Sequence, residues 1–508
     1  MVVGIVFACL ACYVAYFIIW IALRTKRNLP PGPLPLPLIV NLHLLSSKPH
    51  LDLARLGNIY GPIYTLNMGS QLAVVLNSYE IAKEALMKRG NAFAGRPHHF
   101  VGSKFSRDGK GVGFQNYTPT LRRQQKTIMK TVKYFETLKT GENLQEIITK
   151  EVDYLCDLFV SHGCKDFDPR RDMTFAAGNV VGRITFGERF TVENEEFWQL
   201  MDSLKIFVEG LTATSFIDAF PLLRYFPFSL VKRVQTAVKL RDDVLNKRFQ
   251  EHQDRLRGDG MVLAKSKDLT YALIEEANQK TSRTDSQSDT LILTDDHVMM
   301  TMNDTIMAGS ETPTMLLLWN IYFFVKYPDV QARAFKQIDK VISPDQPITW
   351  EDRKRLPYLE AFIAEVMRII SIMPLAVPHL AMVDMVLAGY HISKGTTVIV
   401  NLWAMGHDPK VWDAPMEFRP ERFLDSRGGF STASTEGFTP YGMGLRSCPG
   451  EQLARMELFL FTVRLLRMFE FRASEALPEM LDAEFGITIR PLPFKIRAIK
   501  RHQGIDTT

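Results

Sequence analysis

An uncharged apolar run near the start of the chain limits what this sequence can fold into more than any other feature. Residues 2–23 contain no Asp, Glu, Lys or Arg, and the run ends at the basic residues Arg24, Lys26 and Arg27. A helix of this length rises about 33 Å, which is enough to cross the hydrocarbon core of a bilayer. A cleaved signal peptide would carry positive charge before a shorter apolar core. The sequence therefore predicts a retained single-pass transmembrane anchor at residues 1–23, with the following chain in the cytosol.

The segment after this anchor is predicted to be a stiff connector. Residues 24–40 combine the basic residues with prolines at positions 30, 31, 33, 35 and 37. Because proline fixes φ and removes a backbone donor, a dense series of prolines favours an extended spacer over helix or strand. We expect residues 41–508 to form one large domain, since no repeat or composition shift marks a boundary after the connector.

The composition excludes several classes of function. The net charge is only +5 over 508 residues, and no Lys/Arg tract with interleaved aromatic residues occurs, so nucleic-acid binding is not predicted. The cysteines form an odd and sparse set: Cys9, Cys12, Cys156, Cys164 and Cys448. Such a set argues against a disulfide framework and for a reducing compartment.

Hydrophobic periodicity predicts a mainly helical fold with small β-sheets. The longest predicted helix follows the N-cap Thr294 and runs to Val325, before Tyr327-Pro328 ends it. Its length of about 45 Å is enough to traverse a whole domain. Strands are predicted at residues 63–68, at 72–76 and within 385–401, and polar loops at 281–290 and 426–437.

The chemistry concentrates in a loop that contains Cys448. Residues 441–450 read YGMGLRSCPG, and an amphipathic helix follows with Pro449 at its first position. The cysteine therefore lies near a helix N-terminus, where the dipole and unpaired N–H groups favour a thiolate. Gly442 lets the backbone approach a flat ligand closely, and Arg446 lies within reach of a carboxylate on that ligand. Most single cysteines are buried structural residues, so the loop alone leaves both interpretations open.

Two further motifs precede this loop. Glu365 and Arg368 form an ExxR pair at i and i+3, which places both on one helix face. Residues 418–423 read FRPERF and contain Arg422. Together with the loop around Cys448, this ordered set resembles the cytochrome P-450 family over essentially the whole chain. The resemblance implies haem b with Cys448 as the axial ligand of its iron, and a buried charge cluster of Glu365, Arg368 and Arg422.

The resemblance also implies roles along the long helix. The sequence AGSET, which begins at Ala308, matches the family's pattern for the helix that binds oxygen. Ala308 and Gly309 are expected against the haem, with Gly309 leaving room over the iron, and Glu311 and Thr312 are expected to pass protons to dioxygen. The alternative for Thr312 is a hydrogen bond to a carbonyl one turn earlier. Since Pro313 has no N–H to donate, we expect the helix to open or kink there.

One departure from the family concerns the edge of the haem. The family commonly has a WxxxR motif whose Trp and Arg bind a haem propionate, and this sequence has Leu121 and Gln125 at those positions. A missing charge-assisted hydrogen bond costs about 1.5–3 kcal/mol unless it is replaced, which predicts weak haem retention. The residues expected to bind the cofactor are Arg446, His379, Arg122, Lys126, Tyr441 (where the family usually has Phe), Gly442, Ala308 and Gly309.

The helix expected around Leu121 and Gln125 carries a basic face formed by Arg122, Lys126, Lys130 and Lys133. This face is either simply solvated or a docking site for an acidic redox protein. The resemblance implies an NADPH-dependent reductase or cytochrome b5 as that partner, so that NADPH acts only through the reductase. It also implies that the anchor holds the protein in the endoplasmic reticulum membrane, with the catalytic domain in the cytosol.

Within the family, the sequence is similar to the animal microsomal branch that includes steroid 17-alpha-hydroxylase and the aromatic-hydrocarbon hydroxylases. Residues 60–64, 356–361 and 400–404 carry this similarity. It implies a reductase-dependent monooxygenase that hydroxylates a small lipophilic substrate, either a steroid or an aromatic xenobiotic. The pocket lining is expected from mostly apolar segments: residues 105–114, 210–216, Ala308, 376–377 and 485–487.

One residue and two alternative functions leave the exact activity open. Gly210 stands where the steroid hydroxylase has a polar residue that grips the sterol, which weakens a specifically steroid interpretation. A haem-thiolate isomerase that acts on a peroxide without a reductase is one alternative. A non-catalytic haem- or sterol-binding membrane protein is another, and neither alternative needs the acid and threonine of the AGSET sequence.

Overall fold

The computed structural model describes residues 14–15, 27–37, 39–69, 71–139, 141–213, 215–220, 222–223, 228–258, 268–278, 293–432 and 435–501. The predicted anchor lies outside these ranges apart from Val14 and Ala15, and so does the predicted polar loop at 281–290. Within the described ranges, no helix is both long enough and apolar enough to cross a membrane.

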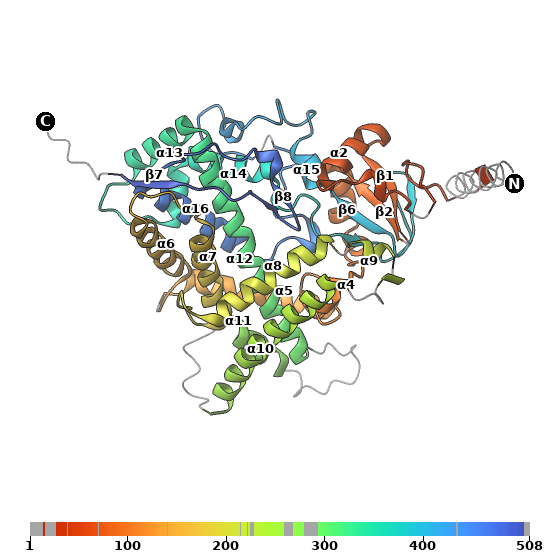
Figure 1. The fold of residues 1–508 in the computed structure, drawn as a ribbon, viewed down its shortest axis with the longest axis horizontal. Helices are drawn as coiled ribbons and strands as arrows, with labels where there is room; N and C mark the ends of the chain where they lie inside the picture. The colour runs from red at the N-terminus through yellow and green to blue at the C-terminus, as the bar shows by residue number, and fades with distance from the viewer. Residues whose placement is uncertain are drawn as a thin grey trace.

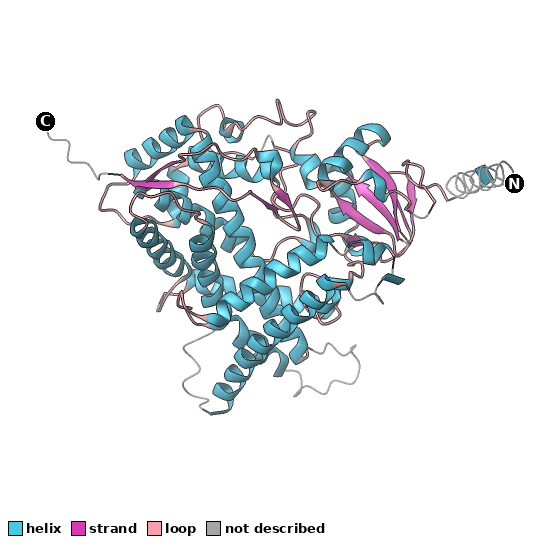
Figure 2. Ribbon diagram, viewed as in Figure 1, coloured by secondary structure: helices cyan, strands magenta, loops and turns pink. Residues whose placement is uncertain are grey.

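Helices dominate the described chain and the strands are few and short, as predicted (Figure 2). The α-helices are α2 (Pro49–Tyr60), α3 (Tyr79–Lys83), α4 (Phe100–Phe105), α5 (Pro119–Thr137), α6 (Leu144–Ser161), α7 (Arg170–Phe186), α8 (Glu195–Ala213), α9 (Ser215–Ala219), α10 (Ser229–Gly258), α11 (Leu269–Asn278), α12 (Asp295–Lys326), α13 (Pro328–Val341), α14 (Pro357–Ile370), α15 (Leu402–Gly406) and α16 (Glu451–Met468). Short helical turns are η1 (Leu42–Leu44), η2 (Glu84–Lys88), η3 (Gly90–Phe93), η6 (Trp350–Arg355), η7 (Pro420–Phe423), η8 (Gly444–Arg446) and η9 (Met480–Asp482).

The long helix α12 runs through the centre of the molecule (Figure 1). It begins after Thr294, whose backbone N–H donates to His297 Nδ1 at 3.2 Å, and two aspartates in its first turn suit the positive end of the dipole. It ends before Tyr327, because Pro328 starts the next helix in a new direction. The predicted bounds of this helix are therefore confirmed to within one residue at each end.

The predicted strands form a four-stranded sheet at one end of the molecule (Figure 1). Its strands are β1 (Ile63–Met68), β2 (Gln71–Leu76), β6 (Thr397–Val400) and β3 (His379–Leu380), in that spatial order. The first two strands are antiparallel, β2 and β6 are parallel, and β3 returns antiparallel to β6. This last pairing places His379 in the same sheet as two strands from the beginning of the chain, with β6 between them. The predicted strand region at 385–401 divides into three strands, and the first two, β4 (Met385–Leu387) and β5 (Tyr390–Ile392), form a separate hairpin that turns at Gly389, where φ is +83°.

Two small sheets close the C-terminal part of the chain. Strands β7 (Phe469–Arg472) and β10 (Arg497–Lys500) pair with each other, and β8 (Glu484–Phe485) pairs with β9 (Ile489–Arg490). Residues 484–490, named the C-terminal hairpin below, are fixed to the helical body. The backbone N–H of Ile489 donates to the carbonyl of Ile372 at 2.9 Å, and Trp319 Nε1 on α12 donates to the carbonyl of Ile489 at 3.1 Å.

Candidate active site

The ExxR pair and Arg422 form one buried charge cluster, as predicted. Arg368 donates to Glu365 through two parallel bonds, from Nε to Oε2 at 2.7 Å and from Nη2 to Oε1 at 2.8 Å. Arg422 Nε donates to Glu365 Oε1 at 3.0 Å, and the backbone N–H of Arg419 donates to the same oxygen at 2.8 Å. The side chains of Glu365 and Arg368 are 0% exposed. Such a bidentate pair is strong and directional.

Backbone carbonyl oxygens accept hydrogen bonds from the guanidinium groups of this cluster and so stabilise its excess positive charge. The remaining N–H groups of Arg368 donate to the carbonyl oxygens of Gly406, Pro415 and Glu417, at 2.7, 2.8 and 3.2 Å. Gly406 ends α15, and Pro415 and Glu417 belong to the segment between α15 and η7, which has little regular structure of its own. The cluster therefore fixes this irregular segment against α14, just before the cysteine loop begins.

The cysteine loop is closed by a backbone bond and by glycine conformations. The N–H of Cys448 donates to the carbonyl of Tyr441 at 2.9 Å. Gly442 and Gly444 both have φ of +73°, in the left-handed region that favours glycine. A Cβ on Gly444 would lie 2.0 Å from the carbonyl oxygen of Leu86 in η2, so only glycine lets the loop lie against that turn. The helix α16 begins at Glu451. Pro449 lies in the turn before this helix, so the prediction that it is the first helical residue is wrong.

The groups of the protein itself shift the pKa of the Cys448 thiol upward. Its side chain keeps an exposed surface, but burial of the surrounding loop raises the pKa of the thiol, and Glu451 adds to the increase. The backbone N–H of Gly450 acts in the opposite direction. The expected lowering by the helix end is thus outweighed by desolvation. A bound metal ion would supply the missing positive charge, because a coordinating thiol is deprotonated outright.

Three basic side chains converge behind this loop. Arg446 donates from Nη1 to the carbonyl of Gln115 at 2.9 Å and from Nη2 to that of Gly113 at 3.2 Å. Arg96 donates from Nε to the same Gly113 carbonyl at 3.0 Å, and from Nη1 to the carbonyl of Pro378 at 3.0 Å. His379 bonds the carbonyl of Phe93 through Nδ1 at 2.7 Å. Within the described chain, none of the three forms an ion pair with Asp or Glu.

The electrostatics of these three groups show a site with an excess of positive charge. Burial, together with Arg96 and Arg446, lowers the pKa of His379 to about 3. Burial lowers the pKa of Arg446 to about 10, and burial and Arg446 hold the pKa of Arg96 well below its usual value. A ligand with negative charge at this place would relieve all three groups. Arg96 was not predicted from the sequence, since no local motif marks it.

Two residues expected in this group lie elsewhere. Arg122 and Lys126 are on the exposed face of α5, and no contact within the described chain joins them to Arg446 or His379. Leu121 is fully buried in the core, whereas Gln125 reaches the cysteine loop, with Nε2 donating to the carbonyl of Leu445 at 3.4 Å. The structure therefore supplies Arg96 as a basic neighbour of Arg446, and leaves Arg122 and Lys126 facing solvent.

Tyr441 differs from the expected Phe by a buried hydroxyl. Within the described residues this hydroxyl has no hydrogen-bond partner, and burial raises the pKa of the phenol. The guanidinium of Arg455 lies over the ring, 5.0 Å from its centroid. Tyr441 thus packs at the base of the loop, on the side of α16.

The helix α12, called the oxygen-side helix below, keeps its regular geometry through the AGSET sequence at residues 308–312. Thr312 Oγ1 donates to the carbonyl of Ala308 at 2.9 Å, which is the helical alternative considered for this residue. The helix is continuous across Pro313, so the expected opening does not interrupt it. Ala308 is exposed although Met307 and Ser310 are buried, so this turn presents one accessible face.

Gly309 and Glu311 have contacts that the sequence did not predict. A Cβ on Gly309 would lie 2.6 Å from Val181 Cγ2, so this glycine allows α12 to approach α7 and does not itself face the accessible side. Glu311 Oε1 accepts from Arg490 Nε at 2.8 Å and from Thr488 Oγ1 at 3.0 Å. The acid of the AGSET sequence is therefore bound to the C-terminal hairpin.

A mainly helical body crossed by one long helix, with a single cysteine at the end of a glycine-rich loop and basic groups behind it, defines a haem-thiolate protein. Comparison with known proteins agrees. The family model Cytochrome P450 matches residues 30–498. Steroid 17-alpha-hydroxylase/17,20 lyase of Gallus gallus is 36% identical over 475 residues, which cover 92% of this chain and 91% of that relative. Cytochrome P450 2U1 of Mus musculus is 33% identical over 522 residues, covering 97% and 95%.

A solved structure gives the same result. A zebra fish cytochrome P450 with progesterone aligns with a TM-score of 0.77 at 31% identity, covering 89% of this chain and 99% of that one. The chain belongs to the cytochrome P450 family and is a haem-thiolate monooxygenase.

The residues present fit the haem that this family binds. Cys448 offers the sulfur ligand, and Arg96, His379 and Arg446 form a basic group that lacks an acidic partner within the described chain. Two propionates carry the negative charge that such a group attracts. The donor set therefore matches the cofactor at both its iron and its acidic edge.

Proposed function

We propose that this monooxygenase hydroxylates a small, flat, lipophilic substrate of the steroid class. The observation that carries this proposal is a cluster of aromatic rings that joins α8 to residues 105–114, a segment expected to line the pocket. The ring of Phe207 on α8 lies 4.5 Å from that of Phe105 and 5.9 Å from that of Phe114, measured between centroids. Apolar surfaces of this kind suit ligands with little polar surface. The names of the similar proteins, a steroid hydroxylase and a structure with progesterone, support the same class.

The side chains nearest to Gly210 offer no polar contact to a substrate. A Cβ at Gly210 would lie 3.2 Å from Val101 Cγ1 and 3.2 Å from Val234 Cγ2, so the position is packed among apolar side chains. A polar grip on a substrate hydroxyl or ketone would therefore have to come from another residue. We infer that the substrate is held mainly by shape and apolar burial, which favours a broader set of substrates than a single sterol.

Each site residue has a distinct part in this proposal. Cys448 would hold the iron, and Arg96, His379 and Arg446 would bind the propionates. When bound, haem supplies the activation of dioxygen, with a thiolate ligand favouring O–O cleavage. Ala308 would border the substrate, whereas Glu311 and Thr312 would hold and move protons at Oε2 and Oγ1.

The proposed partner and location rest on the N-terminal segment and on the basic face of α5. Residues 1–23 would anchor the chain in the endoplasmic reticulum membrane, residues 24–40 would act as the connector, and residues 41–508 would form the cytosolic catalytic domain. On α5, Arg122, Lys126 and Lys130 are exposed and basic, which suits an acidic NADPH-dependent reductase or cytochrome b5.

The substrate class is tested by ligand-induced shifts of the ferric haem spectrum across progesterone, a polycyclic aromatic hydrocarbon and a long-chain fatty acid. Progesterone should give a saturable high-spin shift at lower concentration than the fatty acid. A shift with the fatty acid alone would contradict the steroid class.

The reaction class is tested separately with purified reductase. Product formation that requires reductase, NADPH and dioxygen supports hydroxylation. Rearrangement of a lipid peroxide without reductase would instead indicate an isomerase, and binding without turnover under either condition would indicate a non-catalytic protein.

A further inference from the structure

The C-terminal hairpin contacts the oxygen-side helix through one carboxylate oxygen. Arg490 Nε and Thr488 Oγ1 both donate to Glu311 Oε1, at 2.8 and 3.0 Å. The side chains of Glu311 and Arg490 are each only 12% exposed. Because most of the surface of these two side chains is buried, salt screens the pair far less than an exposed pair. The direction of the Glu311 carboxylate is therefore set by the hairpin.

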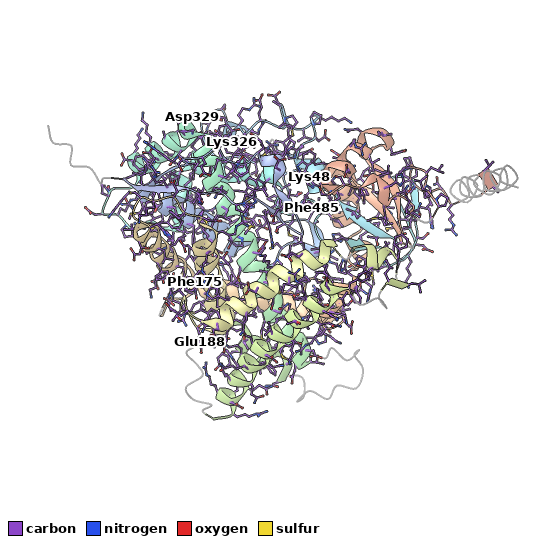
Figure 3. The ribbon with its side chains drawn as sticks, in the orientation of Figure 1. Lys48, Phe175, Glu188, Lys326, Asp329 and Phe485 are labelled. Atoms are coloured by element: carbon purple, nitrogen blue, oxygen red, sulfur yellow. The ribbon has the colours of Figure 1, made fainter. Side chains whose placement is uncertain are left out.

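The hairpin is a rigid support for this arginine. Both backbone polar groups of Ile489, the residue before Arg490, are bonded to the helical body, to Ile372 and to the buried Trp319. Phe485, labelled in Figure 3, stacks its ring on that of His50, with centroids 5.2 Å apart and planes 12° from parallel. The hairpin is thus fixed at both of its strands, so that Arg490 is held in place beside Glu311.

The two carboxylate oxygens of Glu311 differ in their surroundings. Oε1 receives both donors from the hairpin, and the described chain shows no hydrogen bond to Oε2. A carboxylate that is held by one oxygen presents the other in a fixed direction. Thr312, the next residue, carries the only other hydroxyl or acid within the AGSET sequence besides the buried Ser310.

We propose that Arg490 is a positioning residue for proton delivery: it holds Glu311 by Oε1 so that Oε2 takes a proton from solvent and passes it toward Thr312. Arg490 keeps its own charge throughout, and each proton that leaves Oε2 is replaced by one from water. This inference rests on the proposed proton role of Glu311 and Thr312. Since the same hairpin includes residues expected to line the pocket, it also joins the substrate side of the site to the proton side.

The test uses the full-length holoenzyme with reductase, and progesterone as the probe substrate. It compares Arg490→Gln and Thr488→Val, which remove the two donors, with Arg490→Lys, which keeps the charge. The matched control is Arg497→Gln, because Arg497 pairs with Asp166 at 3.1 Å on the same C-terminal segment, away from α12. The measurements are product formed per NADPH, hydrogen peroxide released, the solvent deuterium isotope effect, and the urea midpoint of unfolding.

Arg490→Gln should lower product per NADPH at least about threefold and raise peroxide release. This effect is small beside the whole contribution of a proton-transfer group, because the variant misplaces Glu311 without removing it. Arg490→Lys should recover part of this loss, and Thr488→Val should give a smaller decrease. The reduced carbon-monoxide spectrum should stay unchanged in all of them. An Arg490→Gln enzyme that unfolds at lower urea, as the control does, but keeps its normal product ratio and isotope effect would overturn the positioning role.

Glu311→Gln separates this inference from the function beneath it. If Glu311→Gln changes neither the product ratio nor the isotope effect, Glu311 carries no proton. The proton role of Glu311 and the positioning role of Arg490 then both fail. If Glu311→Gln changes them and Arg490→Gln does not, only the positioning role fails. Positioning further requires that the double variant Glu311→Gln/Arg490→Gln has the product ratio of Glu311→Gln alone, and that the two substitutions shift the urea midpoint less than additively.

Discussion

The guanidinium groups of Arg96 and Arg446 meet on one backbone oxygen, the carbonyl of Gly113, at 3.0 Å from Arg96 Nε and 3.2 Å from Arg446 Nη2. Two like charges held this close repel each other in a buried site. Within the described chain no carboxylate forms an ion pair with either arginine. Holding two positive charges together therefore lowers the stability of the folded protein, and an anion bound beside them raises it again.

Replacement of Arg96 by Leu should make the protein lose haem about 10- to 100-fold faster, because a charge-assisted hydrogen bond is worth about 1.5–3 kcal/mol. The rate is measured by haem transfer to excess apomyoglobin. Arg122→Leu removes the same charge from the exposed face of α5 and serves as the control. Equal acceleration by both variants would show that net charge, and not the Arg96 contact, retains the cofactor.

Cys448→Ala should abolish the reduced carbon-monoxide absorbance band typical of haem-thiolate proteins. The alanine variant retains the loop backbone, since the bond from residue 448 to the carbonyl of Tyr441 uses only the main chain. Far-ultraviolet circular dichroism checks that the variant is folded. A band that persists in the folded variant would exclude Cys448 as the ligand of the iron.

The parts of the site that the sequence predicted correctly depend on local spacing. Glu365 and Arg368 are one helical turn apart, so a single helix places them together, and Arg422 follows in a short motif that meets them. The bounds of α12 were equally local, because an N-cap threonine and a terminal proline mark them in any context.

The parts that the sequence did not predict depend on neighbours far along the chain. Arg96 and Arg446 lie together because both donate to the carbonyl of Gly113, in the loop before α5. The spacing of Arg122 and Lys126 placed them on one face of a helix, but it did not determine which neighbour that face would meet, and it faces solvent. Gly309 likewise serves a helix contact that becomes visible only when α7 is in place.

Glu365→Gln should destabilise the protein by about 3–5 kcal/mol, because it leaves the buried Arg368 without its counter-charge. Urea unfolding followed by circular dichroism measures this loss. The control is Glu421→Gln, whose pair with Arg333 is 40% and 54% exposed and should contribute less than about 1 kcal/mol. Similar losses in both variants would mean that the buried cluster has no special role.

Charge reversal at Lys126 and Lys130 should slow the first electron transfer from the reductase about tenfold at low salt, because steering depends on exposed charge. The difference from wild type should shrink as ionic strength rises and the Debye length falls. Stopped-flow formation of the carbon-monoxide complex measures the rate. The control is Arg257→Glu, near the end of α10, where the side chain of Arg257 is 72% exposed; this variant should have little effect. A salt-independent decrease would instead point to a change in the haem site.

Acid should destabilise this protein partly through His407. Burial, followed by the charge of Arg368, lowers the pKa of His407 to about 3, and its buried Nε2 has no hydrogen-bond partner among the described residues. Below pH about 6.5 the unfolded chain binds a proton that the native ring refuses, so stability rises with pH and falls as acid is added.

The slope from one such proton approaches about 1.4 kcal/mol per pH unit, between roughly pH 5.5 and pH 3.5. His407→Phe keeps an aromatic ring for the stack on Trp403, which lies 4.0 Å away between centroids, but removes the titrating group. Urea unfolding of this variant over pH 4–6 should therefore show a slope smaller by about one proton. Since His50 and His379 also have lowered pKa values, part of the acid sensitivity should remain. A slope identical to that of the wild type would show that His407 takes up its proton in the folded state, and that its buried ring does not resist charge.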